Sequence, residues 1–173
     1  MALSQGKLQT EIKTALDFAS VNMTIFANKF ATAYKNYAVD ALDLSGDSLL
    51  TDGQSAMEAV LATLDAPGNI LSGYATTVEN ACIAFWNASA FAQIIPPPGM
   101  SAEVSVVITP MSAGSIQAGL LTSLLTGAAD TTTSALDHAI KLHAATLTVT
   151  TTHTGPSTAS PFPIIVVGPG AIS

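Results

Sequence analysis

Apolar residues spaced by three and four positions run through the first quarter of the chain and predict helix there. Between about Ser4 and Leu42 they fall on one face of a helix. An unbroken helix of that length would be about 58 Å long. A compact domain of 173 residues is about 40 Å across. We therefore expect this helix either to break, near Thr10 or Asn36, or to project beyond the body of the domain.

The same periodicity predicts further helices along the chain. The segment from Ser55 to Glu58 has a capping-box sequence, in which the hydroxyl and the carboxylate each bond a free backbone N–H, so a helix is expected to start there. Phe26, Phe30 and Trp86 lie on the apolar stripes of the two longest predicted helices and are expected in the core. The later helices are expected at about residues 55–66, 69–94 and 112–126, and from Asp130 or Thr131 to about residue 146.

Two stretches between the helices have other patterns. Residues 100–110 alternate apolar with polar side chains and predict a short strand or extended connector that ends at Pro110. Residues 41–53 are rich in Asp and Gly and predict a loop. Their spacing does not match a calcium-binding loop, because the twelfth position counted from Asp43 is Gln54 and not Glu.

The C-terminal segment, residues 147–173, contains no charged residue and combines β-branched side chains with proline. Disordered segments are poor in such apolar residues, and proline disfavours helix. Extended, the segment would reach about 90 Å, so we expect an arm that packs on another subunit. The residues expected to make those contacts are Leu147, Val149, Phe162, Ile164, Ile165, Val166, Val167 and Ile172.

These patterns together predict a mainly α fold. The expected arrangement is a bundle of four to five helices with a short extended connector and an extended, β-prone C-terminal arm. Residues 1–146 would form the helical body and residues 147–173 the arm for subunit contacts.

The amino-acid composition argues against some classes of function. Hydrophobic residues make up 49% of the chain and charged residues 10%, and five Lys with no Arg face twelve Asp and Glu, for a net charge of −7. Such a chain repels nucleic-acid phosphates, so sequence-specific DNA or RNA binding is not expected. A surface so poor in charge favours burial in an assembly. The N-terminus lacks a basic region followed by an apolar run, so we expect synthesis in the cytoplasm.

Candidate catalytic and metal-binding residues are few. His138 and His143 are five residues apart, about 140° around a helix, which is wrong for a shared zinc ion. Together with His153 they are expected as surface or interface histidines. Cys82 lies among apolar residues and is expected to be a buried, inert thiol. No nucleophile elbow or phosphate-binding loop is present, so we expect no enzyme activity, cofactor, metal or small-molecule substrate.

A membrane role is the alternative from another class. The 26 residues between Glu103 and Asp130 and the 23 between Glu79 and Glu103 carry no formal charge, so either stretch is long enough to span a bilayer. Both are interrupted by proline and polar residues, and neither has a Lys or Arg flank to set its orientation. A small membrane-active pore or holin-like protein is therefore the second hypothesis.

Residues 136–156 (LDHAIKLHAATLTVTTTHTGP) and 164–172 (IIVVGPGAI) resemble the C-terminal part of small virion structural proteins of the neck or connector type from tailed bacteriophages. The resemblance implies helical subunits that form a ring between portal and tail, with C-terminal arms that embrace neighbouring copies. We therefore expect a non-enzymatic, ring-forming head–tail connector, neck or collar subunit that is made in the host cytoplasm and incorporated into the virion. Its expected partners are its own copies and other virion proteins, such as portal or tail components.

Overall fold

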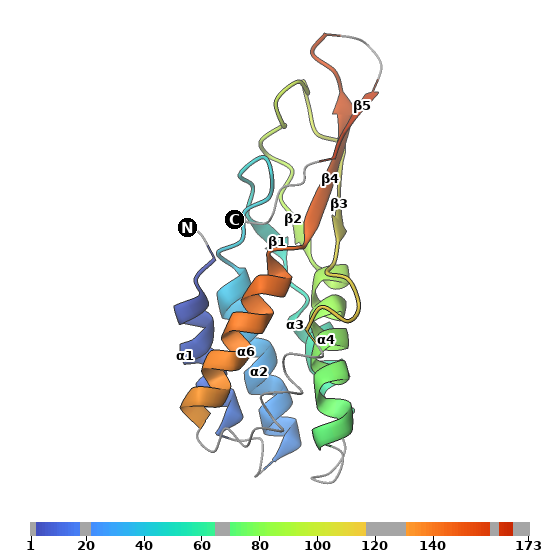
Figure 1. The fold of residues 1–173 in the computed structure, drawn as a ribbon. Coiled ribbons are helices and arrows are strands. Elements are labelled where there is room, and N and C mark those ends of the chain that lie inside the picture. The colour runs from blue at the N-terminus through green and yellow to red at the C-terminus, as the bar shows by residue number, and fades with distance from the viewer. Residues whose placement is uncertain (1–2, 18–21, 65–69, 117–130, 160–162, 168–173) are drawn as a thin grey trace.

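The computed structural model describes residues 3–17, 22–64, 70–116, 131–159 and 163–167 (Figure 1). The fold is mainly α, as predicted, with two small antiparallel sheets. The helices in the described residues are α1 (Gln5–Leu16), α2 (Met23–Ala38), α3 (Gln54–Leu61), α4 (Ile70–Ala88) and α6 (Thr131–Thr146). The strands are β1 (Leu49–Thr51), β2 (Ala90–Phe91), β3 (Ser105–Thr109), β4 (Thr150–Pro156) and β5 (Pro163–Val167).

The helices and the larger sheet occupy different ends of the molecule. Helix α1 packs against α2 and α6, while α3 packs against α2 and α4. Strand β1 pairs with β2, and the second sheet has the order β3-β4-β5 and rises away from the helices (Figure 1). We call this end of the molecule the sheet end and define it as residues 41–51, 89–109, 147–159 and 163–167.

The first predicted helix does break, but the predicted places were wrong. Helix α1 ends at Leu16 and α2 begins at Met23. The Asn22 side chain accepts a hydrogen bond from the Ile25 N–H at 3.0 Å and caps α2, which is a favourable role for Asn at a helix N-terminus. Because the two helices pack on each other, the apolar stripe that looks continuous in sequence faces one shared core.

The predicted capping box at Ser55 was also wrong. Helix α3 begins at Gln54 after an N-cap Gly53 that makes no side-chain cap bond, and Glu58 instead accepts from Asn28 of α2 at 3.2 Å. A Cβ at Gly53 would lie only 2.0 Å from the carbonyl oxygen of Phe85. The close approach of the α3 start to α4 therefore requires glycine there and sets where α3 begins.

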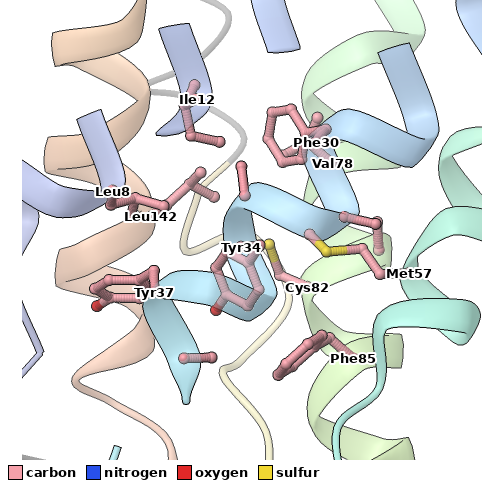
Figure 2. Close-up of a cluster of buried hydrophobic side chains, with 14 of the residues drawn as sticks. Leu8, Ile12, Phe30, Tyr34, Tyr37, Met57, Val78, Cys82, Phe85 and Leu142 are labelled. Carbon is pink, nitrogen blue, oxygen red and sulfur yellow. The ribbon is translucent and has the colours of Figure 1, made fainter. Parts of the chain in front are cut away.

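The core lies between the helices (Figure 2). Phe26, Phe30 and Trp86 are fully buried, so their predicted place in the core is confirmed. A buried polar chain also crosses this core, because Trp86 Nε1 donates to the Tyr34 hydroxyl at 2.9 Å and that hydroxyl lies 2.6 Å from Thr146 Oγ1. These three side chains join α4, α2 and α6.

The other predicted helices and strands agree with the structure to different degrees. The strand expected within residues 100–110 is confirmed as β3, and the last helix is confirmed as α6. The helix expected over residues 69–94 ends at Ala88 and is followed by β2, and the expected loop at 41–53 includes the short strand β1. Residues 112–116 of the helix expected at 112–126 form no helix, and residues 117–126 lie outside the described residues.

Candidate functional site

The sheet end exposes apolar side chains. Among the described residues, the most exposed large apolar side chains are Ile94, Leu50, Val104 and Val107, at 78%, 71%, 66% and 57%, and Ile95 follows them. All five lie at the sheet end, although scattered apolar residues are normal on any protein surface. Within the described residues, the most exposed large apolar side chains are thus concentrated at one end of the molecule.

The same surface is almost free of charge. The segments of the sheet end contain no Lys or Arg and only three acidic residues, Asp43, Asp47 and Glu103. All three acidic side chains are buried. The five lysines lie instead on α1, α2 and α6. Interfaces are depleted in charged residues at their centres, and the described part of the sheet end shares that property.

Along strand β4, the two faces of the larger sheet differ in burial. Thr151, His153 and Gly155 are buried, whereas the alternate residues Thr150, Thr152 and Thr154 are partly exposed. In the register, Val107 of β3 lies opposite Thr152. Because side chains alternate along a strand, the outer face of this sheet presents methyl and hydroxyl groups and the inner face holds a buried polar cluster.

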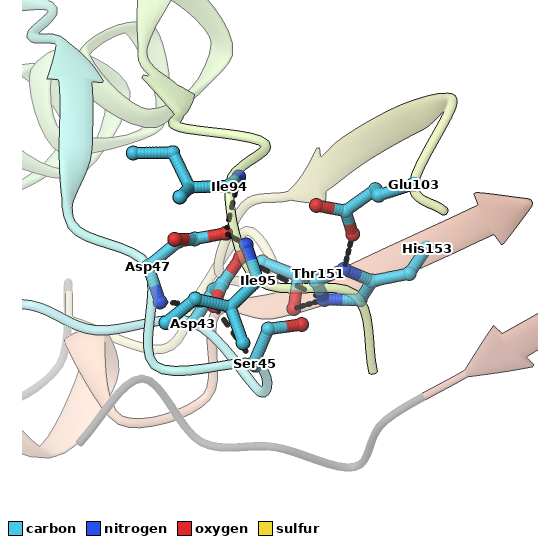
Figure 3. Close-up of polar contacts among 8 residues, drawn as sticks. All are labelled: Asp43, Ser45, Asp47, Ile94, Ile95, Glu103, Thr151 and His153. Atoms are coloured by element: carbon cyan, nitrogen blue, oxygen red, sulfur yellow. Dashed lines mark hydrogen bonds and ion pairs between the residues drawn. The ribbon is translucent and has the colours of Figure 1, made fainter. Parts of the chain in front are cut away.

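His153 is the centre of that cluster (Figure 3). Its Nδ1 contacts the carboxylate of Glu103, its Nε2 lies 2.8 Å from Thr151 Oγ1, and Asp43 Oδ2 lies 3.9 Å from Nε2. A carboxylate oxygen only accepts hydrogen bonds, so the Glu103 carboxylate accepts from Nδ1–H, and the Thr151 hydroxyl contacts the other ring nitrogen. The cluster therefore fixes the orientation of the ring.

The loop that carries Asp43 is held by hydrogen bonds from backbone N–H groups to two side-chain carboxylates. Asp43 Oδ1 accepts from the N–H groups of Ser45 and Asp47, each at 2.9 Å. Asp47 Oδ2 in turn accepts from the N–H groups of Ile94 and Ile95 at 2.9 and 3.0 Å (Figure 3). The backbone beneath the most exposed apolar side chain, that of Ile94, is thus held by a buried carboxylate.

Three buried oxygens of this region have no hydrogen-bond partner among the described residues: Asp43 Oδ2, Ser45 Oγ and Glu103 Oε2. Burial raises the pKa of Asp43, against the effect of its bonds to Asp47 and Ser45. A buried carboxylate oxygen without a donor is destabilising. The cluster therefore stabilises the sheet end less than a fully paired network would.

The Thr151, His153 and Glu103 side chains form a hydroxyl–imidazole–carboxylate chain, an arrangement that can activate a nucleophile. The Thr151 and His153 side chains are fully buried, so a substrate has no access to the hydroxyl. Within the described residues, no group of three His, Cys, Asp or Glu side chains is placed to hold a metal ion. The arrangement connects β4 with the segment before β3.

The two helical histidines are not brought together. His138 is fully buried: its Nδ1–H donates to the Ser134 carbonyl at 2.6 Å, and its Nε2 accepts from the Tyr74 hydroxyl at 2.9 Å. His143 Nδ1 lies 2.7 Å from the Tyr37 hydroxyl. Burial lowers the pKa of both histidines, His138 and His143. The expected surface or interface position was wrong for His138 and His153, because each ring is buried in its own chain between one partner near in sequence and one distant partner, Tyr74 for His138 and Glu103 for His153.

A pocket lies between α1 and α2, outside the sheet end. Glu11, Thr14, Asn28, Lys29 and Thr32 line its volume of about 190 Å³. Small-molecule sites are typically about 300–1,000 Å³ and largely apolar. This pocket is smaller than that range, and all of its lining residues are polar or charged.

Comparisons with models of protein families, with curated proteins and with solved structures give no match. None of the helices in the described residues combines the length and apolar character needed to cross a bilayer.

The residues expected in the C-terminal arm have different positions. Val149 is buried in the core of its own chain, while Leu147 is exposed. Ile164 to Val167 belong to β5, which pairs with β4, and β4 pairs with β3 of the same chain. Part of the expected arm is thus built into the subunit's own sheet. Phe162 and Ile172 lie outside the described residues, and contact of the segment with another subunit stays a prediction.

The polar cluster and the surface built from segments 41–51 and 89–109 were not predicted from the sequence. The alternation of residues 149–155 did contain a clue, since it places Thr151 and His153 on the same strand face as Val149. The partner Glu103 is 50 residues away from His153, and no local pattern identifies that pair.

Proposed function

We propose that this protein is a non-enzymatic virion structural subunit that assembles into a ring, as a head–tail connector, neck or collar protein of a tailed phage. The observation that carries the proposal is the sheet end, where the most exposed apolar side chains gather and every acidic side chain is buried. The virion setting rests on the resemblance of residues 136–156 and 164–172 to neck-type proteins.

Burial of this surface would favour assembly. Full burial of a large apolar side chain contributes about 1.5–3 kcal/mol relative to full exposure. Ile94, Leu50, Val104 and Val107 are each more than half exposed, so together they supply several kcal/mol before the loss of translational and rotational freedom is counted. Few charged groups would need to be desolvated in the process.

In the proposed assembly the five helices form a bundle that serves as the body of the subunit, and residues 147–173 contribute contacts between copies through the sheet end. Portal or tail components would bind the faces of the ring. The net charge of −7 suits a ring that does not grip DNA, either a channel wall past which DNA slides or an outer collar.

The test is the behaviour of the full chain purified without detergent. Sedimentation velocity and negative-stain electron microscopy are expected to show rings of uniform size, and antibody detection in purified virions is expected to show the protein in the particle. A monomer at all concentrations up to the millimolar range would contradict the proposal. Leakage of dye from lipid vesicles on addition of the protein would favour the pore or holin-like alternative.

A further inference from the structure

We propose that neighbouring copies join their sheets head to tail. The edge of β3 that carries no ladder within the described residues would pair with the corresponding edge of β5 in the next subunit. This inference rests on the proposed ring and identifies its interface. The result would be one continuous sheet that runs from subunit to subunit around the ring.

The topology of the larger sheet permits this pairing. Strand β4 is antiparallel to both β3 and β5, so β3 and β5 run in the same direction at the two edges. Strand β3 also packs near β2 and α4, but within the described residues its only ladder is with β4. Rotation about an axis parallel to the strands would bring β5 of one copy beside β3 of the next as a parallel pair, and repetition of that step closes a ring.

The two edge strands lack the features that prevent edge strands of monomers from pairing with other chains. Natural edge strands are commonly protected by charged side chains, proline or bulges. Strand β3 has the sequence Ser-Val-Val-Ile-Thr, without charge or proline, and pairs with β4 in continuous register. Strand β5 has proline only at Pro163, its first residue, where a strand tolerates it. Both edges are therefore suited to pairing with another strand.

The charge distribution favours a second copy of this chain as the partner. Each copy carries a net charge of −7. Asp40 and Asp52, which border the sheet end, are paired with Lys7 and Lys35 at 2.7 and 3.3 Å, and the acidic residues within it are buried. Two copies that meet through their sheet ends therefore avoid bringing unpaired acidic side chains together. A foreign strand would cover one edge and leave the other open, whereas identical copies cover both.

Disulfide trapping tests the pairing in the full chain. The double variant Ser105→Cys with Ile165→Cys places one thiol on each edge, because both positions lie opposite Thr154 in the register. Within one subunit β4 separates β3 from β5 by about 10 Å, whereas the Cβ atoms of a disulfide are about 4 Å apart, so any disulfide must join two copies. A second double variant, Ser105→Cys with Val167→Cys, samples a shifted register. Burial raises the pKa of the native thiol, Cys82, so the unsubstituted chain is a suitable control.

Oxidation of the assembled double variants is expected to give a ladder of covalent oligomers up to the full ring, and each single variant is expected to give none. Covalent dimers from Ser105→Cys alone would show a two-fold pairing of β3 with β3 and would overturn the proposal. Rings that form without any cross-link would defeat the proposed interface and leave the proposed function standing. A chain that stays monomeric in sedimentation would defeat the proposed function itself.

Hydrogen exchange on the unsubstituted protein provides a measurement that needs no variant. Amides in both β3 and β5 are expected to exchange at least about tenfold more slowly in the ring than in the dilute monomer, because each ladder bond slows opening. Unchanged exchange in both strands on assembly would contradict the edge pairing.

Discussion

Replacement of Tyr34 by Phe tests the buried polar chain that links three helices. Tyr34 lies on α2, is fully buried, and accepts from Trp86 Nε1 at 2.9 Å. The Thr146 hydroxyl donates to the Leu142 carbonyl at 2.7 Å, so the Tyr34 hydroxyl must be the donor in its 2.6 Å bond to Thr146 Oγ1. One hydroxyl therefore serves as donor to α6 and acceptor from α4.

The expected loss of stability follows from the hydrogen bonds that Thr146 and Trp86 keep and lose in the variant. Without the Tyr34 hydroxyl, Thr146 keeps its bond to the carbonyl and loses one donor, which costs about 1 kcal/mol. The Trp86 N–H loses the acceptor seen in the structure at a fully buried position, which costs about 1–3 kcal/mol. The free energy of unfolding should fall by about 2–4 kcal/mol, and the Tm should fall by about 5–15 °C for a domain of this size.

Tyr37→Phe is the matched control, because it removes the same atom from the same helix. The Tyr37 hydroxyl lies 2.7 Å from His143 Nδ1, in a contact that is only partly buried, and it also interacts with Thr146. Its loss should cost about 1 kcal/mol. Urea unfolding followed by circular dichroism measures both variants. Equal, small losses in the two variants would refute the assignment of the buried chain as a main link between the helices.

Three further predictions concern other parts of the molecule. Gly53→Ala should lower the free energy of unfolding by about 3 kcal/mol or more, because its Cβ would meet the Phe85 carbonyl oxygen at 2.0 Å, and a small change in urea midpoint would contradict the close approach. Burial lowers the pKa of His138, so the unfolded chain binds the proton more readily and stability should fall as pH drops below about 6.5. His138→Asn should flatten that slope in urea titrations at pH 8 and pH 5, and an unchanged slope would assign it to other groups. Ile94→Lys should prevent assembly with an unchanged circular dichroism spectrum, whereas Ile25→Lys on α2 should assemble, and sedimentation distinguishes the two outcomes.

The helices could be predicted from sequence because each has a long apolar period, and α6 was placed almost to the residue. The break before Asn22 could not, since apolar residues continue on both sides of it and only packing of α1 on α2 decides where the chain turns. The start of α3 depends on contact of Gly53 with Phe85, which lies 32 positions further along the chain. Local hydrogen-bonding patterns such as the Ser55–Glu58 capping box were therefore overridden by tertiary contacts.

The candidate site was less predictable than the fold. Low charge and a β-prone C-terminal segment indicated an assembly surface, but the segment around Ile94 was expected to be helix. Its actual conformation depends on the Asp47 carboxylate, which bonds backbone groups 47 and 48 residues away. Likewise, His153 pairs with Glu103 across 50 residues. Such long-range polar pairs leave no periodic trace in a single sequence.

The strand order has a consequence for when the sheet end can form. Strand β3 obtains its ladder partner only after residues 150–156 have left the ribosome, because β4 is synthesised about 40 residues later. His153, which joins the loop at Asp43 to the segment before β3, emerges at the same stage. The sheet end would therefore take its final form only after β4 has emerged, so the helices α1 to α4, which precede β4 in the chain, have time to fold first.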